Sequence, residues 1–518
     1  MYTTFSLIIC TTILGFIVYY FLQKFRHGTK RRPLPPGPRP WPIVGNLPQL
    51  GPNPHQTIAA LARVHGPLLH LKMGFVHVVV AASASVAEQF LKVHDANFSS
   101  RPPSSGAKHL AYNYKDMVFA PYGPRWRLLR KICALYLFSS KALDDFRLVR
   151  QEEVGILTHT LASAGQRPVT IGDMISVCVT NGIARVMLGR RVVGYGCSGG
   201  DAKAEDFKTM VDELLTLAGV FNIGDFIPPL DGFDLQGVAA KMKIVHARFD
   251  SFLSAIIDEH KIEDSKGADG HSYILSTLLA LKDVDDSDIG GKLTHTEVKA
   301  LLLNLFVAGT DTTAVTVEWA LAELIRNPKI LVQAQQELDL VVGKNRLVTE
   351  SDLAQLTFLQ AIIKENFRLH PATPLSLPRI ANEDCEINGY YIPKSSTLLV
   401  NIWAIGRDPT VWADPLVFRP ERFLVGGERP NADVKGNDYE IIPFGAGRRV
   451  CAGMSLGIRM VRLLTATLIH AVDFELSNGE LAEKLNMDET FKLKLERAQP
   501  LMVHLRPRLA PHVYQVQL

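Results

Sequence analysis

The chain begins with a long apolar segment, and this segment restricts the possible folds more than any other feature. Residues 5–22 read FSLIICTTILGFIVYYFL, 18 residues without a charged side chain. A helix of this length spans about 27 Å at about 1.5 Å per residue, which matches the apolar core of a bilayer. The alternatives are a cleaved signal peptide and a buried core helix, but residues 1–4 carry no charged side chain, whereas five Lys or Arg residues lie between 24 and 32. We therefore predict that residues 1–23 are a single membrane-anchor helix and that the remainder of the chain is cytosolic.

Residues 24–42 form a basic and proline-rich segment behind the anchor. Six prolines between residues 33 and 42 fix φ and remove backbone donors, so we expect a stiff, extended hinge that orients the body on the membrane. A ligand for a proline-binding module is the alternative for such a composition.

Residues 43–518 contain no comparable linker and no internal repeat. Helical periodicity dominates, and β-branched runs at 77–82 and 396–403 predict a minor sheet. We therefore predict one domain, mostly α with small β-sheets, although a length of 518 residues suggests about three domains. The net charge of +4 is too small to indicate a nucleic-acid partner, and six well-separated cysteines without a CxxC pair indicate reduced thiols.

One predicted helix has well-marked ends. A capping box, Thr294-x-x-Glu297, begins the pattern, and Asn327-Pro328 closes it. Because the sequence between them is apolar nearly all round, we expect this helix to be buried.

The centre of this helix, residues 308–313, reads AGTDTT and is poor in helix formers. Buried polar residues need partners, and violations of local rules concentrate at functional sites. We expect a distorted turn in which Asp311 and Thr312 deliver protons to a group bound against the helix. The alternative is a kinked core helix whose hydroxyls bond back to the preceding turn.

A glycine-rich loop, residues 443–453, reads PFGAGRRVCAG and leads into a long helical pattern. It places Cys451 at or just before a helix N-terminus, where N–H groups and the helix dipole favour a thiolate. Gly445, Gly447 and Gly453 permit positive φ and the close approach of a bulky flat group. A lone cysteine is usually a small buried hydrophobe, but these surroundings favour a chemical role for Cys451.

This loop resembles the haem-binding loop of the cytochrome P450 family, FxxGxRxCxG. The matching residues are Phe444, Gly447, Arg449, Cys451 and Gly453. Four further family motifs are present: WxxxR at Trp126 and Arg130, AGTDTT at 308–313, ExxR at Glu365 and Arg368, and FxPxRF at 418–423. The resemblance covers essentially the whole chain. It implies the cytochrome P450 fold, with a haem-thiolate monooxygenase domain over residues 43–518 and a single-pass anchor in the endoplasmic reticulum membrane.

The resemblance also implies roles for individual residues. Cys451 would be the axial ligand of the iron of haem b, and Asp311 and Thr312 would relay protons to dioxygen. The expected haem contacts are Trp126, Arg130, Arg379, Phe444, Arg449 and Gly453. The expected buried ion network is Glu365, Arg368 and Arg422, and the expected substrate contacts are Ala308, Thr373, Leu375 and Lys494.

Three rival functions are disfavoured by the motifs themselves. A member that isomerises or dehydrates its substrate without activating O₂ would not need the Asp311-Thr312 pair. A haem-based sensor or electron carrier would be expected to carry the CxxCH of c-type attachment, which is absent. A non-enzyme that keeps only the fold would not retain every chemical motif.

Several stretches resemble the plant flavonoid 3′-hydroxylases, notably 372–381 and 432–457. This resemblance implies insertion of one oxygen atom from O₂ into the B-ring of naringenin-, apigenin- or kaempferol-type flavonoids. The alternatives are a flavonoid 3′,5′-hydroxylase and a member that acts on another phenylpropanoid or phenolic substrate. Electrons would come from NADPH through a flavoprotein reductase, and the basic residues Arg125, Arg127 and Lys131 are expected to face that partner.

The chain departs from this subgroup near its C-terminus. The subgroup typically carries a loop like EAYGLTLQRA over the substrate pocket, whereas residues 489–498 here read ETFKLKLERA. Lys492 stands where Gly is usual, and Lys494 stands where a small residue, often Thr, is usual. The alternating pattern allows both lysines to point to solvent. Alternatively, Lys494 lies along the pocket wall with its ammonium near the substrate.

Overall fold

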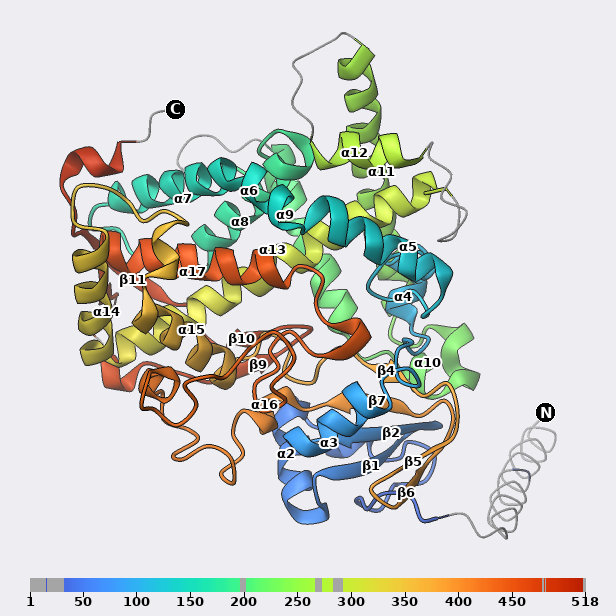
Figure 1. Cartoon of the computed structure of the whole chain (residues 1–518). Coiled ribbons are helices and arrows are strands. Elements are labelled where there is room, and N and C mark those ends of the chain that lie inside the picture. The colour runs from blue at the N-terminus through green and yellow to red at the C-terminus, as the bar shows by residue number, and fades with distance from the viewer. Residues whose placement is uncertain are drawn as a thin grey trace, which may run out of the picture.

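The computed structural model describes residue 15 and residues 32–195, 202–265, 273–282, 292–477, 479 and 481–515. The predicted membrane anchor, residues 1–23, lies outside these residues except for Gly15. Figure 1 shows the described chain as a large helical body above a smaller region that contains β1 and β2.

The body is built mainly from helices, as predicted, with small sheets between them. The long helices are α2 (Pro54–His65), α7 (Arg147–Ala162), α8 (Ile171–Leu188), α9 (Ala202–Gly219), α11 (Val238–Ser265), α13 (His295–Arg326), α14 (Pro328–Val341), α15 (Thr357–Leu369) and α17 (Met454–Ala471). The shorter helices are α3 (Ala84–Glu88), α4 (Ser105–His109), α5 (Pro124–Ile132), α6 (Ser140–Asp145), α10 (Ile223–Phe226), α12 (Ile274–Lys282) and α16 (Ile402–Ile405).

Helix α13 confirms the predicted boundaries. The Thr294 hydroxyl accepts a hydrogen bond from the Glu297 N–H, and the Glu297 carboxylate accepts one from the Thr294 N–H at 2.8 Å, so the capping box is complete. The helix contacts α8, α15 and α17, which explains its apolar surface on most sides. Among the described residues, α8 and α13 are long and apolar enough to cross a membrane, but more than half of each apolar window is buried in the body, as expected of core helices.

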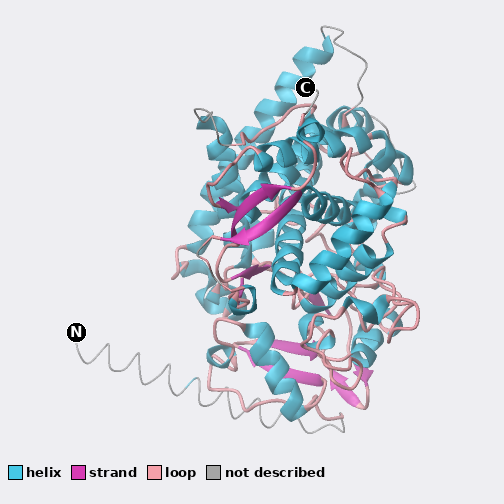
Figure 2. Cartoon of the chain, turned by 90° about the vertical axis from the view of Figure 1, so that its left-hand side faces the viewer, coloured by secondary structure: helices cyan, strands magenta, loops and turns pink. Residues whose placement is uncertain are grey.

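The largest sheet has four strands in the order β1-β2-β7-β4. Strands β1 (Leu68–Met73) and β2 (Val76–Ala81) form an antiparallel hairpin, and β2 pairs in parallel with β7 (Thr397–Val400). Strand β4 (Arg379–Ile380) pairs with the other side of β7. The two β-branched runs that predicted strands are therefore neighbours in this sheet, which Figure 2 shows at the lower end of the molecule.

The remaining strands form three smaller sheets. Strands β3 (Val169–Thr170), β11 (Met502–Pro507) and β8 (Val472–Leu476) form one of them. Strands β5 (Cys385–Ile387) and β6 (Tyr390–Ile392) form a hairpin, and so do β9 (Glu489–Phe491) and β10 (Leu495–Arg497). The β9–β10 hairpin matters for the site because it reaches α13.

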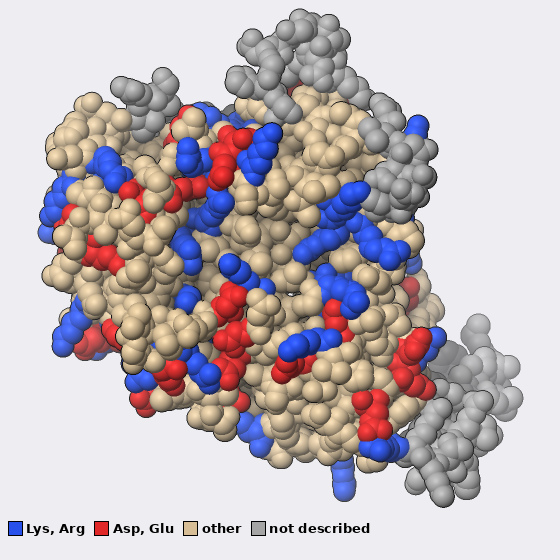
Figure 3. Space-filling model, in the orientation of Figure 1, with Lys and Arg blue, Asp and Glu red and all other residues tan. Residues whose placement is uncertain are grey.

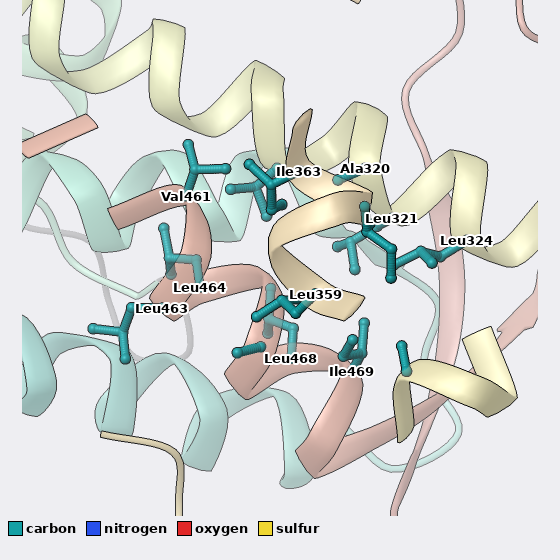
Figure 4. Close-up of a cluster of buried hydrophobic side chains, with 14 of the residues drawn as sticks. Ala320, Leu321, Leu324, Leu359, Ile363, Val461, Leu463, Leu464, Leu468 and Ile469 are labelled. Carbon is teal, nitrogen blue, oxygen red and sulfur yellow. The ribbon is translucent and has the colours of Figure 1, made fainter. Parts of the chain in front are cut away.

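The main hydrophobic core lies where three helices meet. Figure 4 shows side chains of α13, α15 and α17 interdigitating, among them Leu321, Leu359 and Leu464, each with no exposed surface. Interiors of this density transmit displacements between packed helices, so this core fixes the two segments that carry Asp311 and Cys451 relative to each other.

The described part of the proline-rich hinge contains no helix and lies against the body. The carbonyl oxygens of Pro33 and Pro36 accept hydrogen bonds from the N–H groups of Tyr391 and His70, both at 2.9 Å. The segment is therefore extended, as its prolines predict, and is held along the outer side of the sheet region rather than standing free.

Candidate functional site

The glycine-rich loop is shaped by backbone conformations that two of its glycines allow. Gly445 and Gly447 have φ values of +68° and +69°. A Cβ at position 447 would collide with the Leu91 carbonyl oxygen and lie 2.5 Å from the Asp95 carboxylate. Gly453 differs from the prediction, because its φ is −85° and it serves as the N-cap of α17. The positive φ that the three glycines permit is therefore used at 445 and 447 and is not used at 453.

Cys451 stands three positions before the first residue of α17, as predicted. Its thiol lies deep in the body, yet the residue has the accessible area of an exposed one, whereas Cys133 and Cys178 are buried. Burial raises the pKa of the Cys451 thiol, while the Gly453 N–H and the Arg130 guanidinium act in the opposite direction. A residue that combines a deep thiol with accessible surface implies an internal space beside it, unlike the buried Cys133 and Cys178.

The centre of α13 also faces an internal space. Ala308 is exposed, although Phe306 and Thr310 on either side are at most 2% exposed. The expected distorted turn is absent: α13 is continuous through residues 308–313. The Thr312 hydroxyl donates to the Ala308 carbonyl oxygen at 2.7 Å, so the hydroxyl is satisfied within a regular helix.

Four buried or half-buried arginines gather near the glycine-rich loop. Arg449 donates to the carbonyl oxygens of Ser99 and Ala120 and lies 4.5 Å from the centre of the Trp126 ring. Arg379 donates to Asp95 at 3.1 Å and to the Ala446 carbonyl oxygen. The Trp126 N–H donates to the Met117 carbonyl oxygen at 3.1 Å, so this indole supports Arg449 through its ring.

Sequence reasoning missed Arg101, which belongs to the same cluster. Its guanidinium donates to three backbone carbonyl oxygens, those of Val118, Leu377 and Pro378. Burial lowers the pKa of Arg101, and the charges of Arg449 and Arg379 lower it further. The local sequence FSSRPP gives no pattern that distinguishes this arginine from a surface residue.

The positive charge of this cluster is not balanced by nearby carboxylates. Asp95 is shared by Arg379 and Arg448. Burial raises the pKa of Asp116 to about 6, even though Asn304 and two backbone N–H groups donate to it. The guanidinium of Arg130, on α5, makes no hydrogen bond or ion pair with any residue that the structure describes. Buried cations need partners, so the site calls for an anionic group.

Haem fits these residues. Its iron would take the accessible thiol of Cys451, and its two carboxylate side chains would neutralise the guanidinium groups of Arg101, Arg130, Arg379 and Arg449. Phe444, half-buried beside the Cys451 loop, packs edge-on against Phe367 with ring centres 5.2 Å apart and accepts the Cys451 N–H on its carbonyl oxygen.

The predicted ion network is present and fully buried. The Glu365 carboxylate accepts from two nitrogens of Arg368, both at 2.7 Å, from Arg422 at 3.3 Å and from the Arg419 N–H at 2.8 Å. Glu365, Arg368 and Arg422 have no exposed side-chain surface. The network connects α15 to the FxPxRF segment that precedes the glycine-rich loop.

The predicted substrate contacts lie in different surroundings. Thr373 is half-buried, and Leu375 packs into a core cluster with Leu69 and Val80 of the sheet region. Lys494 turns inward: its Nζ lies 2.5 Å from the Asp311 carboxylate, and its side chain is 16% exposed. The interpretation that both lysines point to solvent is therefore wrong for Lys494, whereas Lys492 is 45% exposed and pairs with Glu496.

One of the basic residues expected to face a reductase has another role. Arg125 pairs with Glu297 of the α13 capping box and donates to the Lys292 carbonyl oxygen. Arg127 and Lys131 are exposed on the same helix, α5. Figure 3 shows Lys and Arg side chains gathered over the region of this helix.

Comparison with known proteins agrees with this geometry. The profile of the cytochrome P450 family matches residues 35–502. The chain is 66% identical to a flavonoid 3′-monooxygenase of Petunia hybrida, covering 98% of this chain and 99% of the relative. It is 61% identical to a flavonoid 3′-monooxygenase of Arabidopsis thaliana, covering 99% of both. A flavonoid 3′,5′-hydroxylase of Crocosmia x crocosmiiflora is 53% identical, covering 100% of this chain and 99% of the relative.

Proposed function

The chain belongs to the cytochrome P450 family, and we propose that it is a membrane-bound monooxygenase that hydroxylates the 3′ position of the flavonoid B-ring. The observation that carries the proposal is Cys451, whose thiol lies deep in the body near the Arg130 guanidinium although the residue keeps accessible surface. The substrate class rests on the relatives, since the flavonoid 3′-monooxygenases are 66% and 61% identical and the 3′,5′-hydroxylase of Crocosmia is 53% identical.

Haem ligated by a thiolate supplies the oxygen-activating chemistry, because the sulfur donates electron density to the iron. The chain's own part is to hold that group. Cys451 would ligate the iron, Phe444 would lie against the ligating loop, and the arginine cluster would bind the carboxylates. Gly447 allows the loop to approach closely, since a side chain there would strike Leu91 and Asp95.

Thr312 and Asp311 can hold and move protons at defined atoms. The Thr312 Oγ1 proton is held by the Ala308 carbonyl oxygen, and rotation of the hydroxyl can turn it toward the internal space. A cavity of about 10 Å³, enough for one water molecule, borders Thr310 and Asp311 and is lined on its other side by Ser176 and Thr180. A water there would connect the Asp311 carboxylate to two hydroxyls, which suits general acid–base work.

Membrane attachment is supported by exposed apolar side chains on two segments, one near residue 42 and one near residue 234. Trp41 and Ile43 are 57% and 56% exposed, and Phe233 and Leu235 are 73% and 65% exposed. The two pairs lie on neighbouring segments, because residue 45 bridges to β1 and the loop after β1 hydrogen-bonds to α10. Deletion of residues 1–23 should weaken retention in carbonate-washed microsomes without loss of haem; full retention would remove the anchor assignment.

The test of the function is turnover of a panel of flavonoids by microsomes that contain the full chain and a plant NADPH-dependent reductase. Naringenin, apigenin and kaempferol should each gain one hydroxyl at the 3′ position, identified by mass spectrometry and NMR, only when NADPH is present. Supplying the 3′-hydroxylated products as substrates separates the alternative, because a 3′,5′-hydroxylase would add a second hydroxyl. Absence of any hydroxylated flavonoid, with a normal haem content, would contradict the proposal and favour another phenolic substrate.

A further inference from the structure

The β9–β10 hairpin is fixed between α13 and the segment that follows α15. The Leu495 carbonyl oxygen accepts the indole N–H of Trp319 at 2.9 Å, and the Leu495 N–H donates to the Ala372 carbonyl oxygen at 2.9 Å. At the tip, Leu493 lies against the end of α9, where a Cβ on Gly219 would come within 2.6 Å of the Leu493 nitrogen. The hairpin is therefore enclosed on three sides, and its tip has little freedom to swing out.

Lys494 lies in this tip and reaches α13. Its ammonium is 2.5 Å from the Asp311 carboxylate and 3.0 Å from the Glu496 carboxylate. The side chains of Lys494, Asp311 and Glu496 are 16%, 5% and 22% exposed. Among the residues that the structure describes, Lys494 is the single cationic partner of Asp311. Lys492 contacts the far side of the same group, at 2.7 Å from Glu496, and is 45% exposed.

A buried carboxylate of this kind depends on its cation. Removing the cation from such a pair leaves an uncompensated charge in the interior, which is strongly destabilising. The pairing is mutual, since burial would lower the pKa of Lys494, but the carboxylates of Asp311 and Glu496 raise it. Two other carboxylates lie nearby: Glu496 shares the Lys494 ammonium, and Asp212 of α9 lines the cavity that Asp311 borders, to which α8 contributes Ser176, Val177 and Thr180.

We propose that Lys494 is a positioning residue that holds the Asp311 carboxylate in one orientation, and thereby sets where Asp311 exchanges protons during the reaction. The inference rests on the proposed function, in which Asp311 is a proton-handling group. It also gives the ammonium a role other than substrate recognition. Two carboxylates within 3.0 Å neutralise its charge and take up two of its three N–H donors.

The first test measures how much the Lys494–Asp311 pair stabilises the protein, and it does not depend on enzyme turnover. The melting temperatures of the haem-loaded full chain are compared for the wild type, Lys494→Met, Asp311→Asn and the double variant. Lys494→Met should melt below the wild type because it leaves Asp311 buried and unpaired, and the double variant should recover about half of that loss or more. Lys492→Met is the matched control, since its half-exposed pair with Glu496 contributes little. Additive losses in the double variant would overturn the pairing.

The second test addresses the positioning role. Product formed per NADPH consumed is measured against pH for the wild type, Lys494→Met, Lys494→Arg and Lys492→Met. Lys494→Met should lose about tenfold at neutral pH and should depend on pH differently from the wild type, because the contact that orients the Asp311 carboxylate is removed. Lys494→Arg keeps the charge and should restore both quantities, and Lys492→Met should match the wild type. If product per NADPH for Lys494→Met follows the same dependence on pH as the wild type, the proposal is overturned.

The two tests separate this inference from the proposed function. If flavonoids are not substrates, the melting temperatures still decide whether Lys494 and Asp311 act as a pair. If flavonoids are hydroxylated normally by Lys494→Met at every pH, the function stands and the positioning role fails. If Lys494→Met does not fold, recovery of a folded, haem-loaded protein in the double variant supports the pair, and failure of both contradicts it.

Discussion

Replacement of Glu365 by Gln tests how far the buried ion network holds the body together. The carboxylate accepts two hydrogen bonds from Arg368, one from Arg422 and one from a backbone N–H, and neither it nor the two guanidinium groups has exposed side-chain surface. Glutamine keeps the shape of the side chain but removes its charge. Its amide N–H groups would also face the N–H groups of Arg368 or Arg422, where no hydrogen bond can form. Two buried cations would then lose their shared anion.

The expected loss is about 3–5 kcal/mol of unfolding free energy, the range for removing one member of a buried pair. The Arg368 carbonyl-oxygen contacts and the Arg422–Glu428 pair at 2.6 Å remain, which places the loss within this range rather than above it. The assay is urea unfolding of the haem-loaded protein, followed by far-UV circular dichroism. Expression of folded protein should fall as well, since this loss is a large part of a typical stability.

Arg506→Gln is the control for this prediction. Arg506 pairs with Glu475 at 2.7 Å, but the two side chains are 76% and 58% exposed, so its removal should change the unfolding free energy by about 0–1 kcal/mol. Equal losses of unfolding free energy for Glu365→Gln and Arg506→Gln would refute the reasoning, because burial would then make no difference to how much an ion pair stabilises the protein.

Three further perturbations test separate parts of the structure. Gly447→Ala should lower the haem content per polypeptide, because its Cβ would collide with neighbouring backbone at a φ of +69°. Glu489→Gln should lose about 3 kcal/mol of stability at neutral pH. Burial alone would raise the pKa of Glu489, but hydrogen bonds from His55 and Trp403 and the charge of Arg407 lower it from 4.5 to about 2. This stabilisation is present above pH 4.5 and is lost as pH falls toward about 2, so the gap between wild type and variant in a pH series of unfolding should close in that window. Thr312→Ala should keep haem and substrate binding but lower the product formed per NADPH, with hydrogen peroxide released instead.

Each of these has a control within the chain. Gly445→Ala has a similar φ but open space around its Cβ, so it should lose less haem than Gly447→Ala; equal losses would assign the effect to strain alone. A constant stability gap between pH 7 and 3 would contradict the account of Glu489. Thr313→Ala removes a neighbouring hydroxyl that donates to the Gly309 carbonyl oxygen, four residues back in the same helix. If Thr313→Ala forms as little product per NADPH as Thr312→Ala, Thr312 has no special role.

Local sequence signals predicted the local features of the fold. The capping box located the start of α13, the β-branched runs located β2 and β7, and the glycine-rich loop placed Cys451 ahead of α17. Each of these depends on residues close together in the chain, where turn chemistry and periodicity act directly.

Features that depend on distant partners could not be predicted in the same way. The Lys494–Asp311 pair joins residues 183 positions apart, and Arg101 reaches carbonyl oxygens up to 277 positions away. The predicted distortion of α13 was wrong for a local reason: the Thr312 hydroxyl bonds to the Ala308 carbonyl oxygen without breaking the helix. Polar residues in a buried helix therefore did not predict the geometry of that helix.

The most direct test of the central claim is the spectrum of the reduced, carbon monoxide-treated protein for the wild type, Cys451→Ser and Cys133→Ser. Cys133 is buried, and burial raises the pKa of its thiol to about 12, so it should be replaceable. The account predicts the thiolate-type spectrum of the cytochrome P450 family for the wild type and Cys133→Ser and its complete loss in Cys451→Ser. A thiolate-type spectrum that survives in Cys451→Ser would contradict the assignment of the iron ligand and, with it, the proposed site.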